Sequence, residues 1–276
     1  MNRDLSTSPQ SLLRPLSVLH LLGIIIIMAV FYSLPVLQGS GREMDYTTQI
    51  TRFLGHFFPP DFSVIPEAMS ALNETFQIAV MATLFSVCLS LPLGIAGSKN
   101  ISPPWLVRFT RMALNLIRTI PGLIWALLGV SLVGANPLAG VIGLTFYSTG
   151  YLGKFFCDSI ESVPLDTAKS LKALGADSIQ SFQWGIWPQT KIHFLSHTLW
   201  MFEYNIRSAS IIGYVGAGGI GVQLHTFQEY YAWSKFSAVL ILLLGLVIIL
   251  DSLGEKVRQT IKQKADPKPQ NTDSLQ

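Results

Sequence analysis

Two long apolar stretches constrain this chain more than any other feature. Residues 16–37, and residues 236–250 with their flanks, contain few polar side chains, and a membrane-spanning helix needs about 20 mostly apolar residues. In lipid every backbone amide must find its partner inside the protein, so such runs cross the membrane as helices or as parts of a closed barrel. Composition agrees, because 50% of the residues are hydrophobic and only 13% are charged, against about a quarter charged in soluble domains. At this length and periodicity we expect an all-α integral membrane protein.

Six segments are apolar and long enough to predict transmembrane helices. They are residues 16–37, 72–97, 120–134, 138–157, 191–212 and 236–250. The first is longer than the apolar core of a signal peptide and lacks a small-residue cleavage site after it, so we expect an uncleaved anchor. Most of the 19 basic residues fall on one side of this arrangement, and the positive-inside rule then places both termini in the cytoplasm.

Several function classes find no support in the sequence. The net charge is +3 and no basic stripe interleaved with aromatic residues occurs, which argues against nucleic-acid binding. His193 and His197 have the spacing of a zinc-binding helix, but Phe194 stands where the general base of that motif belongs. Lys154 follows a glycine without the rest of a phosphate-binding loop. We therefore expect no catalytic residue, metal or cofactor in this chain, and any ATP hydrolysis must take place on another one.

Five glycines crowd one short segment and include a dinucleotide-binding spacing. Gly216, Gly218 and Gly221 match G-x-G-x-x-G, with Gly213 and Gly219 beside them. That motif requires a preceding strand and an acidic residue about 20 positions later, and the sequence supplies neither. Glycine also permits positive φ and close packing, and irregular backbone at membrane depth must be buried in protein or line water. The cluster predicts the outer end of a span, either as a packing turn or as an extracellular gate.

Charged and polar side chains interrupt the fifth predicted span. Glu203, Asn205 and Arg207 lie within it, and each charge at the centre of a span costs about 2.5 to 3.5 kcal/mol on insertion scales. These side chains must therefore face a polar interior, where Glu203 and Arg207, four residues apart, can pair. Two interpretations stay open: a structural pair that locks helices together, or a pathway in which Arg207 offers its planar donors to an oxyanion.

Hydroxyl groups from two spans could line the same cavity. Tyr147, Ser148 and Thr149 are consecutive in the fourth span, and Ser208 follows the charged stretch of the fifth. Such residues also pack transmembrane helices against one another, so both roles stay open.

Residues 166–188 have helical periodicity outside the predicted spans. Leu171 and Leu174 precede Gly175, and Ile179 and Phe182 follow it, which predicts two short amphipathic helices with a break at the glycine. A solvated loop needs no apolar stripe, whereas a loop that docks into a groove on another protein does.

This segment resembles the coupling loop of permeases of binding-protein-dependent ABC importers. That loop has an E-A-A run, a glycine four residues after its last alanine and a proline thirteen residues after the glycine, a separation that Gly175 and Pro188 reproduce. Residues 173–176 fit the surrounding pattern, whereas residues 169–171 and Trp187 depart from it. The resemblance implies that a cytoplasmic ATPase contacts this loop. The candidate contact residues are Ala168, Lys169, Leu171, Leu174, Gly175, Ala176, Ile179 and Pro188.

A narrower resemblance covers residues 57–258. Residues 57–62, 74–79, 202–209 and 215–221 are similar to permease subunits of phosphonate and phosphite importers. In that family a permease homodimer surrounds the pathway in the membrane lipid, an ATPase dimer binds ATP and Mg, and a periplasmic binding protein delivers the anion. The resemblance implies a type I ABC importer permease fold with a cytoplasmic coupling helix. It also implies import of a phosphonate, phosphite or hypophosphite across the bacterial inner membrane by alternating access.

These expectations define the regions and the candidate pathway. The regions are a cytoplasmic tail 1–15, a first helix 16–37, a periplasmic loop 38–71, a permease core 72–258 with coupling loop 158–189, and a cytoplasmic tail 259–276. The candidate pathway or gate residues are Glu203, Asn205, Arg207, Ser208, Tyr147, Ser148, Thr149, Gly216, Gly218, Gly219 and Gly221. Two alternatives remain: an ABC permease for another small solute such as an amino acid, and a gradient-driven secondary transporter, which would not need the docking stripe.

Overall fold

The computed structural model describes residues 13–38, 45–164 and 166–265, and the chain forms two units, Met1–Phe53 and Leu54–Gln276. The first unit holds helix α1 (Leu13–Ser33), the short helix η2 (Leu34–Gln38) and most of α2 (Tyr46–Phe57). The apolar stretch Leu19–Val36 has none of its residues buried in protein, as expected of a single helix surrounded by lipid.

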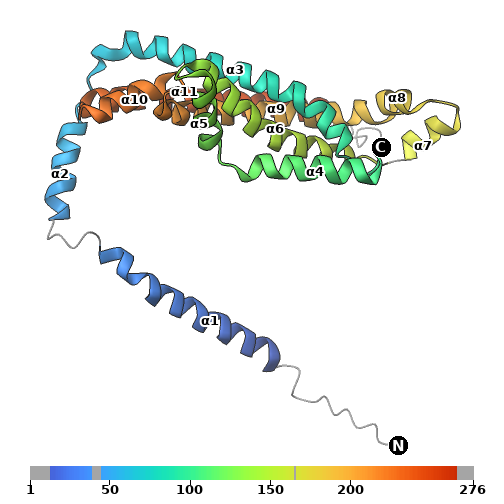
Figure 1. Ribbon diagram of the computed structural model, residues 1–276, viewed down its shortest axis with the longest axis horizontal. Helices are drawn as coiled ribbons and strands as arrows, with labels where there is room; N and C mark the ends of the chain where they lie inside the picture. The colour runs from blue at the N-terminus through green and yellow to red at the C-terminus, as the bar shows by residue number, and fades with distance from the viewer. Residues whose placement is uncertain (1–12, 39–44, 165, 266–276) are drawn as a thin grey trace, which may run out of the picture. The chain divides into compact units, whose positions relative to one another are not determined.

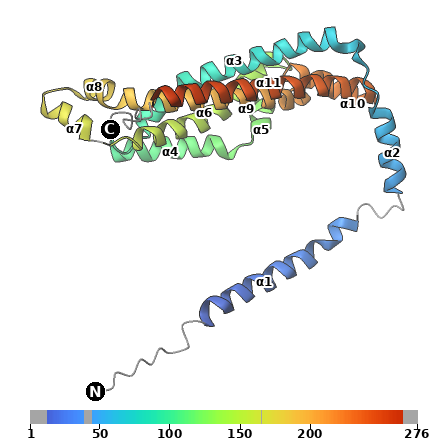
Figure 2. The same ribbon diagram turned by 180° about the vertical axis from the view of Figure 1, so that it is seen from behind.

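The second unit is a helical bundle, and no strand occurs among the residues that the structure describes. Its elements are η3 (Phe62–Val64), α3 (Ile65–Ala96), α4 (Pro104–Thr119), α5 (Gly122–Val133), α6 (Pro137–Glu161), α7 (Asp166–Ala173), α8 (Ser178–Ser181), η4 (Phe182–Ile186), α9 (Trp187–Ile212), η5 (Gly213–Val215), α10 (Ile220–Glu229) and α11 (Trp233–Ala265). Helix α6 is central and packs against α3, α4, α5 and α9. Within this unit, α7 and α8 lie at one end and α10 at the other (Figures 1 and 2). We call these the coupling end and the glycine end.

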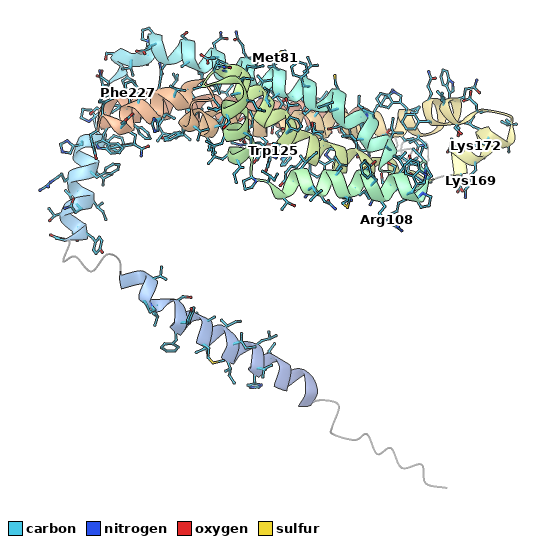
Figure 3. The ribbon with its side chains drawn as sticks, viewed as in Figure 1. Met81, Arg108, Trp125, Lys169, Lys172 and Phe227 are labelled. Atoms are coloured by element: carbon cyan, nitrogen blue, oxygen red, sulfur yellow. The ribbon has the colours of Figure 1, made fainter. Side chains whose placement is uncertain are left out.

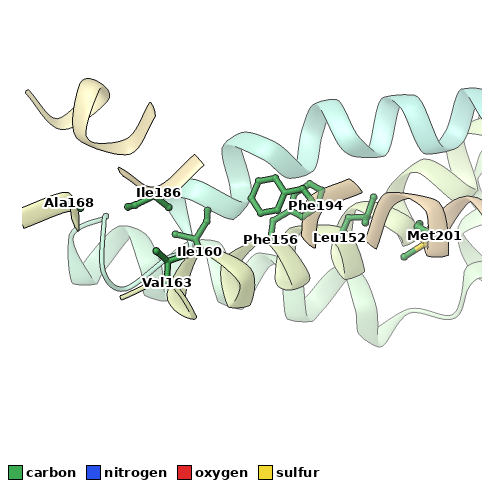
Figure 4. Packing of buried hydrophobic residues seen from close by; sticks show 8 residues of the cluster. All are labelled: Leu152, Phe156, Ile160, Val163, Ala168, Ile186, Phe194 and Met201. Atoms are coloured by element: carbon green, nitrogen blue, oxygen red, sulfur yellow. The ribbon is translucent and has the colours of Figure 1, made fainter. Parts of the chain in front are cut away.

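The bundle is held together by apolar side chains and by small residues at helix crossings. Near the coupling end, Phe156 of α6 stacks on Phe194 of α9 with ring centroids 4.2 Å apart, inside a cluster of fully or nearly buried residues (Figure 4). Toward the glycine end, a Cβ on Gly143 of α6 would lie 2.7 Å from the backbone of Ala126 in α5. Small residues at such positions let membrane helices approach closely, which stabilises the bundle by dispersion contacts.

The third predicted span differs from the structure. Helix α5 has 12 residues and is therefore about 18 Å long, which is short of the roughly 30 Å hydrocarbon core of a bilayer. It joins α4 at a break of 87°, and only the two helices together pass as one broken span. The remaining predicted spans overlap α1, α3, α6, α9 and α11. Of these five helices, α1, α3 and α11 are long and apolar enough to cross a membrane, whereas α6 and α9 do not reach that length and hydropathy.

Helix α4 lies between the second and the third predicted spans and belongs to neither of them. It begins at a proline in its first turn and buries Val107, Thr110 and Leu114 while exposing Trp105 and Arg108. A helix that is apolar on one face only has a low average hydropathy, so a search of the sequence for long apolar stretches does not find it. Helix α4 packs along the half of α6 nearest the coupling end (Figure 1).

Several helix ends also lie outside the predicted segments. Helix α3 begins at Ile65, and α2 occupies part of the predicted loop 38–71. Helix α11 extends beyond the predicted span 236–250 and ends at Ala265. Between α2 and η3, the prolines of residues 58–61 interrupt the helices as expected. The Asp61 carboxylate then begins η3 by accepting a hydrogen bond from the Ser63 amide at 3.0 Å. Residues 1–12 and 266–276 of the predicted tails lie outside the described residues.

Candidate functional site

The coupling end contains the two short helices that the sequence predicts. Helix α7 ends before Gly175, which has φ +95° and therefore a conformation that other residues adopt at a cost. Helix α8 begins with a capping box, in which Asp177 and Gln180 each accept from the other's backbone amide. A π-helical turn, η4, then leads into α9, which has Pro188 in its first turn.

This segment is fixed to the bundle on one face and open on the other. Ala168 is buried, and its carbonyl accepts a hydrogen bond from the Ser181 hydroxyl at 2.9 Å. Leu174 and Ile179 are 85% and 75% exposed, and Trp184 is exposed beside them. Leu174 and Ile179 of the predicted stripe are therefore presented away from the protein, as a docking surface requires. The other two residues of the stripe, Leu171 and Phe182, are half-buried, and Phe182 packs against the core cluster.

The other predicted contact residues are either half-buried or exposed. Leu171 and Ala176 are half-buried, whereas Gly175 and Pro188 are exposed. Lys169 is exposed on α7 at the coupling end (Figure 3).

The glycine cluster forms a buried turn at the opposite end. Gly216, Gly218 and Gly219 have φ of +83°, +83° and +74°. The Gly219 amide donates to Oε1 of Glu74 at 3.1 Å, and the next amide donates to Oγ1 of Thr75 at 2.8 Å. A Cβ on Gly221 would collide with the backbone of α9. These hydrogen bonds anchor η5 and α10 to α3. The turn can make them because a glycine-rich backbone comes close to the side chains of α3.

Glu203 and Arg207 form ion pairs with α11, and the pairing with each other predicted above is wrong. Nη1 of Arg207 lies 2.8 Å and 3.0 Å from the two carboxylate oxygens of Asp251. The Glu203 carboxylate, 7% exposed, accepts from Nη1 of Arg258. A Cβ on Gly254 would overlap the Glu203 carboxylate, so the glycine lets α11 approach α9. Packing between two helices, which spacing along one helix does not reveal, selects these partners.

Asp251 and Arg258 were not predicted as site residues. A usable signal was present, because the two residues are seven positions apart, or about two helical turns, and so lie on one face of α11. Their charges oppose those of Arg207 and Glu203 in sign.

Asn205, Ser148 and Thr149 lie in helix interfaces. The Asn205 side chain is fully buried, donates to Oγ1 of Thr83 in α3 at 2.9 Å and accepts from the Ser148 hydroxyl at 2.7 Å. The Thr149 hydroxyl donates to the carbonyl one turn earlier in its own helix, at 2.7 Å. These groups satisfy one another and connect α3, α6 and α9 inside the bundle.

Tyr147 and Ser208 are brought together at a small cavity. The cavity has a volume of about 90 Å³, and Tyr204 and the first residues of α5, Gly122 and Leu123, line it with them. The Tyr204 hydroxyl donates to that of Tyr147 at 2.8 Å, and the two rings stack with centroids 5.5 Å apart. Tyr204 was not predicted, although it precedes Ser208 by one helical turn and so shares its face.

Comparison with known proteins identifies the family. Residues 90–263 match the model of the binding-protein-dependent transport system inner membrane component. The chain belongs to this family. It is therefore a transport subunit of the inner membrane and not an enzyme, and it works with a separate ATPase subunit and a substrate-binding protein.

Relatives and solved structures agree with this assignment. The chain is 31% identical over 214 residues to the phosphite transport system permease protein PtxC of Stutzerimonas stutzeri, covering 77% of this chain and 78% of that protein. It is 30% identical over 210 residues to the putative phosphite transport system permease protein HtxC of the same organism, covering 76% and 74%. An inward-facing structure of the MetNI methionine ABC transporter matches with a TM-score of 0.60 at 18% identity, over 70% of this chain and 95% of that one. The fold is that of a type I ABC importer permease, as predicted.

Proposed function

We propose that this chain is the permease subunit of an ATP-driven importer that moves a phosphorus oxyanion into the cytoplasm. The substrate class comprises phosphonate, phosphite and hypophosphite. The likeness to PtxC and HtxC, at about 30% identity over three quarters of the chain, is the observation that carries this proposal. The hydroxyl groups of Tyr147, Tyr204 and Ser208 around one cavity support it, because oxyanions accept several hydrogen bonds at once.

The exposed stripe of the coupling end is the surface on which the ATPase subunit docks. Leu174 and Ile179 offer apolar area there, and Gly175 allows the sharp turn between α7 and α8. ATP and Mg are held by the ATPase partner. When ATP draws two ATPase subunits together, the coupling helices follow, and the permease shifts from one packing of its helices to the other.

The pathway runs past the cavity on the α6–α9 face. Tyr147 and Ser208 contact the passing anion, while Glu203 and Arg207 act on the gate through their partners on α11. Asn205, Ser148 and Thr149 hold the helices that carry the pathway. The glycine turn fixes its outer end by tying α10 to α3.

A second copy of this chain completes the pathway, and both termini lie in the cytoplasm. The outer face of α4 supports the homodimer, because Arg108, Asn115 and Thr119 are exposed there beside a groove of about 710 Å³. Polar side chains at membrane depth are costly against lipid, so they indicate a face covered by protein or by water. The orientation rests on the positive-inside rule.

Uptake by the complete importer tests the proposal. The permease, its ATPase subunit and its binding protein are reconstituted in proteoliposomes, and uptake of phosphite, hypophosphite and methionine is compared with and without ATP. ATP-dependent uptake of a phosphorus oxyanion is expected. Uptake of methionine alone would favour the amino-acid alternative, and uptake of either solute without ATP, driven by an ion gradient, would favour a secondary transporter.

A further inference from the structure

Arg118 lies near the end of α4, and its side chain packs against the middle of α6. It is the penultimate residue of α4, directly before the 87° break that leads to α5. A Cβ on Gly150 would lie 2.8 Å from Cγ of Arg118, so the arginine stem crosses α6 at that glycine. Gly150 lies near the middle of α6, which runs from Pro137 to Glu161. A cation is therefore held halfway along the central helix of the bundle.

Among the residues that the structure describes, no carboxylate pairs with the guanidinium of Arg118. Arg111, Arg207 and Arg258 each pair with an acidic side chain, but Arg118 takes part in none of the ion pairs among the residues that the structure describes. Its Nε is buried and donates no hydrogen bond within that same part of the chain. Leaving such a donor unsatisfied costs free energy, so a site with this property calls for an acceptor that arrives from outside.

Aromatic rings connect this charge to the cavity. The guanidinium carbon lies 4.5 Å from the centroid of the Tyr151 ring, and that ring lies 4.9 Å from the ring of Tyr147. Tyr147 in turn contacts Tyr204 and lines the cavity with Gly122, the first residue of α5. The positive end of the α5 dipole thus faces the same space as the tyrosine hydroxyls.

We infer that Arg118 is the residue that binds the charge of the oxyanion on its way through the permease, with Tyr147, Tyr204 and Ser208 as hydrogen-bonding partners. The inference rests on the proposed function. A ring holds the face of a guanidinium and leaves the donors in its plane free, so an anion can bind without displacing Tyr151. Arg207 is less suited to this role, because its Nη1 already donates to both carboxylate oxygens of Asp251, at 2.8 Å and 3.0 Å.

The test uses three variants of the complete reconstituted importer. Arg118→Met removes the charge and keeps the stem, Arg118→Lys keeps the charge, and Lys256→Met removes an exposed cation from α11 as a control. Phosphite and hypophosphite are the probes, with basal ATPase activity and co-purification of the ATPase subunit measured alongside. We expect Arg118→Met to lower phosphite uptake by about tenfold or more, with Arg118→Lys intermediate and Lys256→Met near the unmodified protein.

Charge dependence separates binding from a structural role. Phosphite can carry two negative charges and hypophosphite only one, so the loss in Arg118→Met should be larger for phosphite. Unchanged uptake in Arg118→Met would overturn the inference. Equal losses in Arg118→Met and Arg118→Lys, accompanied by lower basal ATPase activity or poor co-purification, would overturn it in favour of helix packing. If the unmodified importer takes up neither anion, the proposed function itself fails.

Discussion

The two ion pairs between α9 and α11 should contribute very different amounts to stability. The side chains of Glu203 and Arg258 are 7% and 24% exposed, whereas those of Arg207 and Asp251 are 40% and 47% exposed. Removing one partner of a buried pair leaves an uncompensated charge and costs about 3 to 5 kcal/mol. An exposed pair contributes about 0 to 1 kcal/mol.

Arg258→Met therefore tests the buried pair directly. We expect it to lower the Tm of the purified permease complex by about 10 °C, since 1 kcal/mol shifts the Tm of a chain of this size by about 2 to 4 °C. Asp251→Asn should lower it by no more than about 3 °C. Lys256→Met, an exposed position on the same helix, is the matched control.

A second substitution distinguishes pairing from packing. Adding Glu203→Gln to Arg258→Met removes the buried charge, so most of the lost stability should return. The reasoning is refuted if the double variant is no more stable than Arg258→Met alone. A loss in Asp251→Asn as large as that in Arg258→Met would show that the Arg207–Asp251 pair faces hydrocarbon rather than a polar space.

Three further predictions address the turn, the coupling end and the external segment. Gly219→Ala should destabilise the protein by about 1 to 3 kcal/mol, because φ is +74° and the new Cβ would lie 2.5 Å from Oγ1 of Thr75; an unchanged Tm would contradict this. Leu174→Asp should leave the Tm unchanged, since the side chain is 85% exposed, yet abolish co-purification of the ATPase subunit, and normal recovery of that subunit would disprove the docking surface. Hydrogen bonds from the hydroxyl and the amide of Ser63, with a smaller contribution from a nearby lysine, hold the pKa of Asp61 below its ordinary value. The stability that these hydrogen bonds contribute is fully present above the ordinary pKa of Asp61 and is lost as pH falls through its lowered pKa. Hydrogen exchange at the Ser63 amide, corrected for its intrinsic rate, should therefore become faster in acid. Protection of this amide that does not change with pH would contradict the prediction.

The helical class of the fold and the two short helices of the coupling end follow from local features of the chain. Apolar runs such as residues 236–250 predict helices, because a helix in lipid satisfies the hydrogen bonds of its backbone amides and carbonyls within one segment. The break at Gly175 and the cap at Asp177 are local, because each depends on residues within one or two turns of chain. The glycine turn was predicted for the same reason, although its alternatives stayed open until its partners on α3 were visible.

Which polar groups meet depends on how the helices pack against one another. Asn205 bonds to Thr83 across 122 residues of sequence, and Glu203 and Arg207 find their partners on α11 rather than on each other. Arg118 lies outside every predicted span, and its contact with Gly150 became visible only when α4 was placed against α6. Periodicity tells which residues share a helix face, but the rotation and depth of each helix are set by packing against its neighbours. The position of a charge in the bundle, and with it the candidate site for the anion, therefore follows from contacts between segments that are far apart in the chain.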